Sequence, residues 1–161
     1  MTWFPVVNAI LRVFNFNAGA ETIVLSDDGV AGNGISRIDS TLGEVITFVN
    51  PSTWLTVNTG PGSGTDTINV QGLDSTWNAS VTLDGDTDDT VNFQVNPTNV
   101  GAGNLIVDAS AININAQATA GANILLNAAG TSGDVVLDAD VKSTSGHISV
   151  VANDDVDQNA D

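Results

Sequence analysis

One short pattern of polar and apolar residues returns five times in the second half of the chain. It reads polar, apolar, any residue, apolar, polar and alanine. Alternation with a period of two is typical of a strand with one buried face. A strand that recurs along a chain is typical of a solenoid. The five copies end at Ala109, Ala116, Ala128, Ala139 and Ala152.

The spacing of these strands predicts a coil of about 23 residues. Looser copies of the pattern lie upstream, and glycine- and asparagine-containing corners separate the copies. A parallel β-helix accounts for this period, with Ile, Val, Leu and Ala side chains inside. An antiparallel sandwich of the immunoglobulin type also has short strands at similar intervals, but the chain lacks a cysteine pair and the strand steps recur too evenly. We therefore predict an all-β fold, a parallel β-solenoid.

The first 17 residues differ in character from the rest. Their apolar residues fall near helical spacing, and Pro5 suits a first helical turn. This predicts a short amphipathic helix that caps the open end of the solenoid. Two further strands are the alternative, because residues 11–16 also partly alternate.

The chain divides on this basis into residues 1–20, an N-terminal cap or joint segment, and residues 21–161, the β-solenoid. A bare solenoid end is an open sheet edge that invites pairing with another chain. The apolar residues of the first segment are therefore candidates for a self-assembly interface. They are Trp3, Phe4, Ile10 and Phe14.

Charge and composition limit the classes of partner that we expect. Nineteen acidic residues face three basic ones, for a formal net charge of -16. Such a surface repels phosphate backbones and anionic lipid, so we expect no nucleic-acid partner. The chain has no apolar run near the ~20 residues of a membrane helix, so we expect no membrane insertion. The absence of cysteine rules out disulfides and thiolate metal sites.

Two acidic turns raise the question of calcium. Residues 61–69 fit the calcium-binding nonapeptide at all but its first position, and residues 84–92 keep part of it. In that motif carboxylates and loop carbonyls supply hard oxygen ligands. The alternative is two acidic turns stacked side by side, one coil apart. Ca²⁺ is the one cofactor that the sequence suggests, and its candidate ligands are Asp66, Asp86, Asp88 and Asp89.

Catalytic chemistry is poorly supported. His147 is the only histidine, and it occupies the polar first position of a repeated pattern, where a surface residue is expected. Trp54 and Trp77 are 23 positions apart, and packing explains them better than sugar stacking. Several asparagines flank the apolar strand positions, and stacked asparagines can form hydrogen-bonded ladders. We expect no catalytic residues.

Two regions resemble known repeat proteins. Stretches such as ETIVLSDDGVAGNGISRID and SVTLDGDTDDTVNF resemble repeats of very large bacterial surface proteins, notably those of planctomycetes. From Gly103 onward, text such as SAININAQATAGANILLNAAG is similar to filamentous-haemagglutinin-type adhesin repeats. The resemblance implies a right-handed parallel β-helix, secreted or on the cell surface, with a structural or adhesive role.

These observations lead to a ranked expectation of function. The first is a non-enzymatic extracellular structural protein, a rod segment that assembles head-to-tail with copies of itself into a filament. The alternative is an adhesin or stalk segment of a larger surface protein that binds glycan or calcium. A polysaccharide-degrading β-helix enzyme ranks third, because such lyases need basic residues and only Arg12, Arg37 and Lys142 are present.

Overall fold

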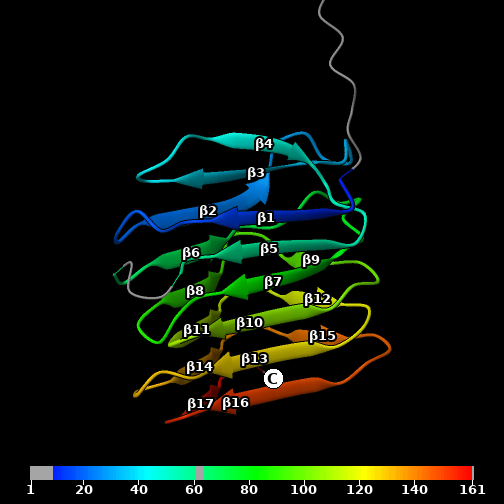
Figure 1. Cartoon of the computed structure of the whole chain (residues 1–161). Coiled ribbons are helices and arrows are strands. Elements are labelled where there is room, and N and C mark those ends of the chain that lie inside the picture. The colour runs from blue at the N-terminus through cyan, green and yellow to red at the C-terminus, as the bar shows by residue number, and fades with distance from the viewer. Residues whose placement is uncertain (1–8, 61–63, 161) are drawn as a thin grey trace, which may run out of the picture.

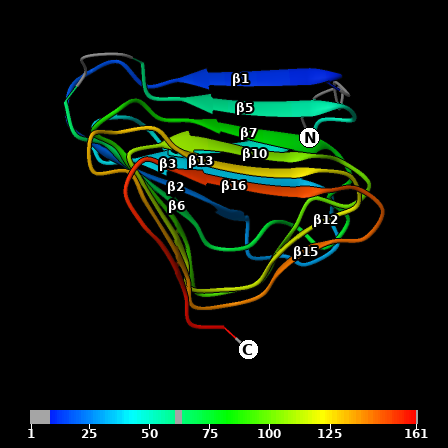
Figure 2. The same cartoon turned by 90° about the horizontal axis from the view of Figure 1, so that it is seen from below.

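The computed structural model describes residues 9–60 and 64–160, and every regular element within them is a β-strand. The strands form a stack of coils of about 23 residues each (Figure 1). The prediction of an all-β parallel solenoid is therefore confirmed. Viewed along the stack, the coils enclose one interior between three sides (Figure 2).

The first side is a six-stranded parallel sheet. Each strand comes from a different coil, so that residues far apart in the chain lie in register. Leu55, for example, pairs with Val81, which pairs with Leu105. In order, its strands are β1 (Leu11–Asn15), β5 (Trp54–Asn58), β7 (Ser80–Asp84), β10 (Leu105–Ala109), β13 (Ile124–Ala128) and β16 (Ile148–Ala152).

The second side is an eight-stranded sheet of mixed direction. Six strands are parallel, and two more pair antiparallel at the N-terminal end of the stack. These two strands lie beyond the level of β1, which is the edge strand of the first sheet at this end (Figure 1). In order, the strands are β17 (Val156–Gln158), β14 (Asp134–Leu137), β11 (Ala111–Ile114), β8 (Thr90–Phe93), β6 (Thr67–Val70), β2 (Thr22–Asp27), β3 (Ile35–Ser40) and β4 (Ile46–Val49).

The third side holds only short parallel strands. They carry small inward side chains, such as Ala118 and Ala120, which are fully buried. Strands of this length contain too few alternating positions to reveal a period. The strands are β9 (Thr98–Asn99), β12 (Ala118–Ala120) and β15 (Val141–Ser143).

Inward side chains form continuous apolar columns through the stack. Ile68, Val91 and Ile112 lie in register in the second sheet, and each is fully buried. Burial of side chains of this size stabilises the fold by about 1.5–3 kcal/mol each. The columns explain the alternating pattern, because the pleat sends every second residue into the interior.

Backbone torsion at one coil corner and close backbone approach at another account for the glycines there. Gly101 has a φ of 64°, a conformation that side chains with a Cβ rarely adopt. Gly133 has no such torsion, but a Cβ on it would collide with the Ala128 carbonyl oxygen. The corners identified from composition therefore need glycine for two separate reasons.

The predicted N-terminal helix is wrong within the described residues. β1 is a strand of the first sheet and pairs with β5 along its whole length. Arg12 and Phe14 are turned inward, in the alternation of a strand. The strand forms in place of the helix because five backbone positions then pair with β5. The alternative prediction, that this part of the chain adds further strands, is confirmed for residues 11–15. Residues 1–8 lie outside the described residues.

A cluster of aromatic side chains fills the N-terminal end of the interior. The ring centroid of Phe48, on β4, lies 5.1 Å from that of Phe14 and 6.4 Å from that of Trp77. The Arg12 guanidinium lies 5.4 Å from the centre of the Phe48 ring, and its Nε donates to the Val49 carbonyl at 2.9 Å. Phe48 and Trp77 are almost fully buried. The antiparallel strands thus close this end of the core with side chains of the same chain.

Val95 is strained, and its replacement is expected to stabilise the fold. It is the one described non-glycine residue with positive φ, at 71°, which is exceptional for a β-branched side chain. Its side chain is 72% exposed, so little packing is lost with it. We expect Val95→Asn to raise the free energy of unfolding by about 1 kcal/mol, measured by urea denaturation. Val30→Asn, at an exposed site without this torsion, is the control, and an equal change in both variants would contradict the strain.

Candidate functional site

The acidic turn between β7 and β8 brings three of the four candidate calcium ligands together. Carboxylate oxygens of Asp86, Asp88 and Asp89 lie within 4.8 Å of one another. The side-chain interaction with Asp86, and then partial burial and the charges of Asp86 and Asp89, raise the pKa of Asp88. Three carboxylates at this separation repel one another, and protonation of one of them relieves that repulsion.

The fourth candidate, Asp66, lies one coil away and stacks on Asp89. Asp66 donates its backbone N–H to Asp89 Oδ1 at 2.7 Å across 23 residues, and both side chains are fully buried. Glu21, one level nearer the N-terminus, repeats the arrangement by donating its N–H to Asp66 Oδ1 at 2.7 Å. The predicted alternative of two stacked acidic turns is therefore confirmed, and it extends to a column of three acids.

The hydrogen bonds of Asp89 separate it from its exposed neighbours. Its Oδ1 accepts from Asp66, and its Oδ2 accepts from Thr59 Oγ1 at 2.5 Å and from the Asp86 N–H at 2.9 Å. A buried carboxylate that accepts several N–H and O–H groups is held as an internal cap of the corner. Calcium binding at this turn stays a prediction, and its more accessible ligands would be the half-buried Asp86 and the exposed Asp88.

An asparagine ladder runs along the outside of the second sheet. Asn113 Nδ2 donates to Asn92 Oδ1 and Asn92 Nδ2 donates to Asn69 Oδ1, both at 2.9 Å. The predicted stacking of asparagines is confirmed for these three residues. Because each amide both donates and accepts, the ladder can continue for as long as the register holds.

The matching column on the first sheet contains two adjacent aspartates. Asp84 pairs in register with Asp108, between Asn58 and Asn127. Burial, and then the charge of Asp108, raise the pKa of Asp84. The ionised form of Asp84 is therefore less favourable in the folded chain than in the unfolded chain.

Replacement of Asp84 by asparagine is expected to stabilise the protein at neutral pH. A raised folded pKa means that ionisation costs stability above that pKa, and that the cost disappears where both states are protonated. Because the site is exposed, we expect Asp84→Asn to gain only about 0.5 kcal/mol at pH 7 and nothing below about pH 3. Urea denaturation across this range measures the gain, with Asp154→Asn as a control of equal charge. A gain that persists in acid would refute the repulsion.

Asp74 is a buried polar centre that the sequence analysis missed. Its carboxylate accepts N–H groups from Gly32 at 2.6 Å, Gly34 at 3.2 Å and Thr76 at 3.0 Å, and it also accepts from Thr76 Oγ1 and Asn50 Nδ2. Burial alone would raise the pKa of Asp74, but the bonds from Thr76, Gly32 and Gly34 outweigh it and hold that pKa below its usual value. The donors come from three connections, so Asp74 ties the β2–β3 turn and the end of β4 to the next coil.

No protein-family model, no curated protein and no solved structure matches this chain. No helix in the described part of the chain has the length and apolar character needed to cross a membrane.

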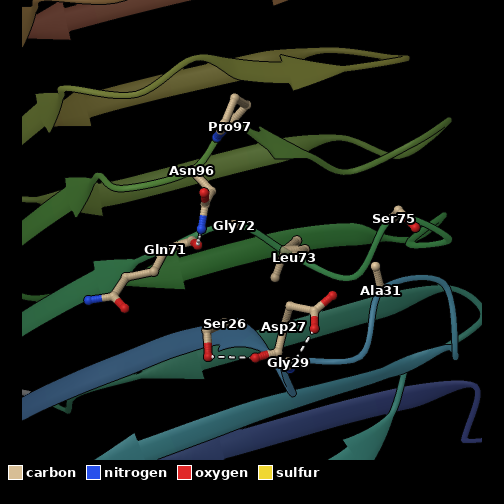
Figure 3. A pocket seen from close by; sticks show the side chains of 10 residues that line it. All are labelled: Ser26, Asp27, Gly29, Ala31, Gln71, Gly72, Leu73, Ser75, Asn96 and Pro97. Carbon is tan, nitrogen blue, oxygen red and sulfur yellow. Dashed lines mark hydrogen bonds between the residues drawn. The ribbon is translucent and has the colours of Figure 1, made fainter.

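A groove of about 480 Å³ lies on the flank of the stack, between the β2–β3 turn and the connections that follow β6 and β8 (Figure 3). Asp27 Oδ1 is engaged by the Gly29 N–H at 2.6 Å. The carboxamide of Gln71 extends away from Leu73 (Figure 3), so the polar groups do not converge on one point. No aromatic side chain lines this groove.

The remaining sequence-predicted residues are distributed as follows. His147 is exposed just before β16, as expected. Trp77 is buried and donates its indole N–H to the Ala79 carbonyl at 2.8 Å, which confirms the packing role. Trp54 instead pairs in register with Ser80, and its indole N–H donates to Thr82 Oγ1. The two tryptophans are therefore not stacked, because the step between their coils is longer than 23 residues.

The candidate self-assembly residues fall into different environments. Phe14 packs inward on Phe48, whereas Ile10 is 68% exposed at the start of β1. Trp3 and Phe4 lie outside the described residues. Among the described candidates, Ile10 alone is available to another molecule, and its role in a joint stays a prediction.

Among the described residues, no strand lies beyond β16 and β17 at the C-terminal end of the stack. Beneath the last coil lies a hollow of about 350 Å³, where the apolar columns of the interior reach the surface. Ile148 and Val156 are 45% and 49% exposed, although they continue the columns of Ile124 and Val135, which are buried. Side chains that line the hollow include Leu137, Ala139, Val141, Ile148 and Val150.

Proposed function

We propose that this chain is a structural, non-enzymatic protein that works outside the cell or at the cell surface as a segment of a β-solenoid rod. The observation that supports the proposal best is the difference between its two ends. Phe48 and Trp77 fill the core at the N-terminal end, whereas the apolar columns stop uncovered at β16 and β17. A repeat stack with an uncovered terminal coil stabilises whatever adds a further layer to it.

The edge strands supply the means of addition. In the described chain β16, β17 and β15 each pair with a strand on one side only. Unpaired N–H and C=O groups along a strand form a template for another strand. Apolar columns beneath the same edge add burial to the new hydrogen bonds, so both directional and non-directional forces favour elongation there.

The buried carboxylates support a structural role over a catalytic one. Asp74 and Asp89 are almost fully buried, and each accepts three or more hydrogen bonds from its own chain. A general acid or base must reach a substrate proton, and these groups are turned to backbone N–H donors instead. The charge of -16 favours solubility and opposes nucleic-acid binding.

Electron microscopy and sedimentation of the purified chain test this function. We expect rods longer than one chain at high micromolar concentration, shortened or absent in the variant Ile148→Lys/Val156→Lys, because edge lysines oppose strand pairing. The control Val30→Lys/Val95→Lys adds the same charge at exposed positions on the flank. Monomers at every concentration and salt level, or equal loss of rods in both variants, would reject the proposal.

An adhesive stalk is the second candidate, and the flank groove favours it. Asp27, Gln71 and Ser75 give the groove hydrogen-bonding groups beside the apolar Leu73 and Pro97, although these groups do not converge on one point. A glycan array probed with the wild type and with Asp27→Ala tests it. Binding that the substitution removes would support adhesion, and an array without hits, together with no thermal shift on addition of calcium, would exclude this candidate.

A further inference from the structure

Exposed large hydrophobic side chains gather at the two ends of the stack. At the N-terminal end they lie on β1, on β4 and in the turn before β4, and at the other end they lie in the last coil. Among the described residues only Val30 and Val95 lie elsewhere, on the flank. Apolar surface confined to two ends indicates contacts at those ends. The end residues are Ile10, Leu11, Val13, Leu42, Val45, Ile46, Ile148, Val151 and Val156.

The N-terminal end is stepped, and its step protrudes. β3 and β4 extend the second sheet by two strands beyond β2, whereas the first sheet stops at β1 (Figure 1). The turn between β3 and β4 carries Leu42 and Val45, and Ile46 pairs with the buried Ile38 and so continues an inner column. Leu42 and Ile46 line a common hollow with Glu44, so the step presents two apolar side chains and one carboxylate there.

Strand direction allows this step to continue the opposite end of another molecule. β17 runs parallel to β2 through four intervening strands. β3 is antiparallel to β2, and β4 is antiparallel to β3, so β4 runs the same way as β17. A copy placed end to end, without inversion, would add its β4 to β17 as a parallel strand, and its Ile46 would face the C-terminal hollow.

Charge opposes contact between two C-terminal ends. Two of the three basic residues, Arg12 and Arg37, lie at the N-terminal end. The C-terminal coil and the segment above it hold a group of acids: Asp138, Asp140, Asp154, Asp155 and Asp157. Contact between two C-terminal ends would bring two such groups together, which costs free energy. The N-terminal end also holds Asp39, which pairs with Arg37, and Glu44, so its two arginines offset these acids but leave no excess of positive charge.

We propose that the occupant of the C-terminal hollow is the stepped N-terminal end of a second copy, which enters with Leu42 and Ile46. This inference rests on the proposed function, since it specifies which surface elongates the stack. The contact is heterologous, so repetition gives an open linear assembly. Because the chain carries a charge of -16, added salt strengthens the contact by screening repulsion between copies.

Cysteine cross-linking tests this contact directly, because the chain has no cysteine of its own. The variant Ile46→Cys/Ile148→Cys carries one thiol at each end, and Val30→Cys/Val95→Cys carries two on the flank. Under mild oxidation at high micromolar concentration, we expect the first to give a ladder of disulfide-linked oligomers and the second to stay mostly monomeric. The rate should differ about tenfold or more, because docking raises the effective thiol concentration.

Single-cysteine variants separate the remaining outcomes. A mixture of Ile46→Cys and Ile148→Cys should give mainly the mixed dimer. Preferential dimers of Ile148→Cys with itself would overturn the proposal in favour of contact between like ends. Absence of cross-links while the wild type still forms rods would overturn it and leave the proposed function intact. Absence of rods in the wild type as well would reject the proposed function.

Discussion

Asp74→Ala is expected to lower the free energy of unfolding by about 3 kcal/mol, measured by urea denaturation. The substitution leaves the N–H groups of Gly32, Gly34 and Thr76 without their acceptor, along with the Asn50 amide. Each buried donor left unpaired costs about 1–3 kcal/mol, and water that enters the truncated site recovers part of this. The loss should be largest at the N-terminal end, because Asp74 ties the β2–β3 turn and β4 to the stack.

The pH dependence of this effect has a definite sign. The folded-state pKa of Asp74 lies below its usual value, so the carboxylate stabilises the fold above the unfolded pKa of about 3.9. That contribution is lost as the pH falls from about 4 through the folded pKa. Asp74→Asn keeps the volume and one acceptor oxygen but cannot titrate. Its stability should therefore lie between those of Asp74→Ala and the wild type at pH 7, and the gap to the wild type should narrow in acid. A gap that is constant with pH would contradict this account.

Asp89→Ala is the second large effect, again about 3 kcal/mol of lost stability at neutral pH. Its carboxylate accepts from Asp66, Thr59 and Asp86, and it is fully buried. Removal of a buried acceptor with charge-assisted bonds leaves the donors of two neighbouring coils unpaired. Thermal or urea denaturation measures the loss.

The exposed neighbour Asp88 provides the matched control for Asp89. Asp88→Ala removes the same charge from the same turn, and we expect the unfolding midpoint to stay within experimental error of the wild type. A calcium titration of all three proteins separates the two roles of the turn. If calcium raises the midpoint of the wild type strongly, and Asp89→Ala abolishes that rise while Asp88→Ala keeps it, Asp89 acts as a ligand as well. A midpoint of Asp89→Ala that equals the wild type without calcium would refute its role as an internal cap.

The coil architecture could be predicted because its signal is local and repeated. Alternation at sites such as Ile112 and Ile114 appears within four residues, and the coil period repeats it. The strands β9, β12 and β15 escaped prediction because two or three residues with small side chains carry no period. β3 escaped because its inward positions include Ser36 and Ser40 as well as Ile38.

The polar sites likewise include one that the sequence predicts and one that it does not. The stack of Asp66 on Asp89 could be predicted, because their spacing equals one coil. The role of Asp74 could not, because its partners Gly32, Gly34 and Asn50 lie 24 to 42 positions away and no motif links them. The helix expected near the N-terminus failed for a related reason. The spacing of Leu11 and Phe14 fits a helix and that of Phe14 and Phe16 fits a strand, and only the partner strand β5 decides between them.

The C-terminal edge as a site of elongation is the central claim, and hydrogen exchange measured by mass spectrometry tests it most directly. At low micromolar concentration, amides of β16 and β17 should exchange faster than those of the enclosed β7 and β8. At high micromolar concentration, protection should rise in β16, β17 and β4, while β7 and β8 stay unchanged. If the protection of β16 and β17 does not change with protein concentration, the claim is contradicted, whether the sample holds rods or monomers.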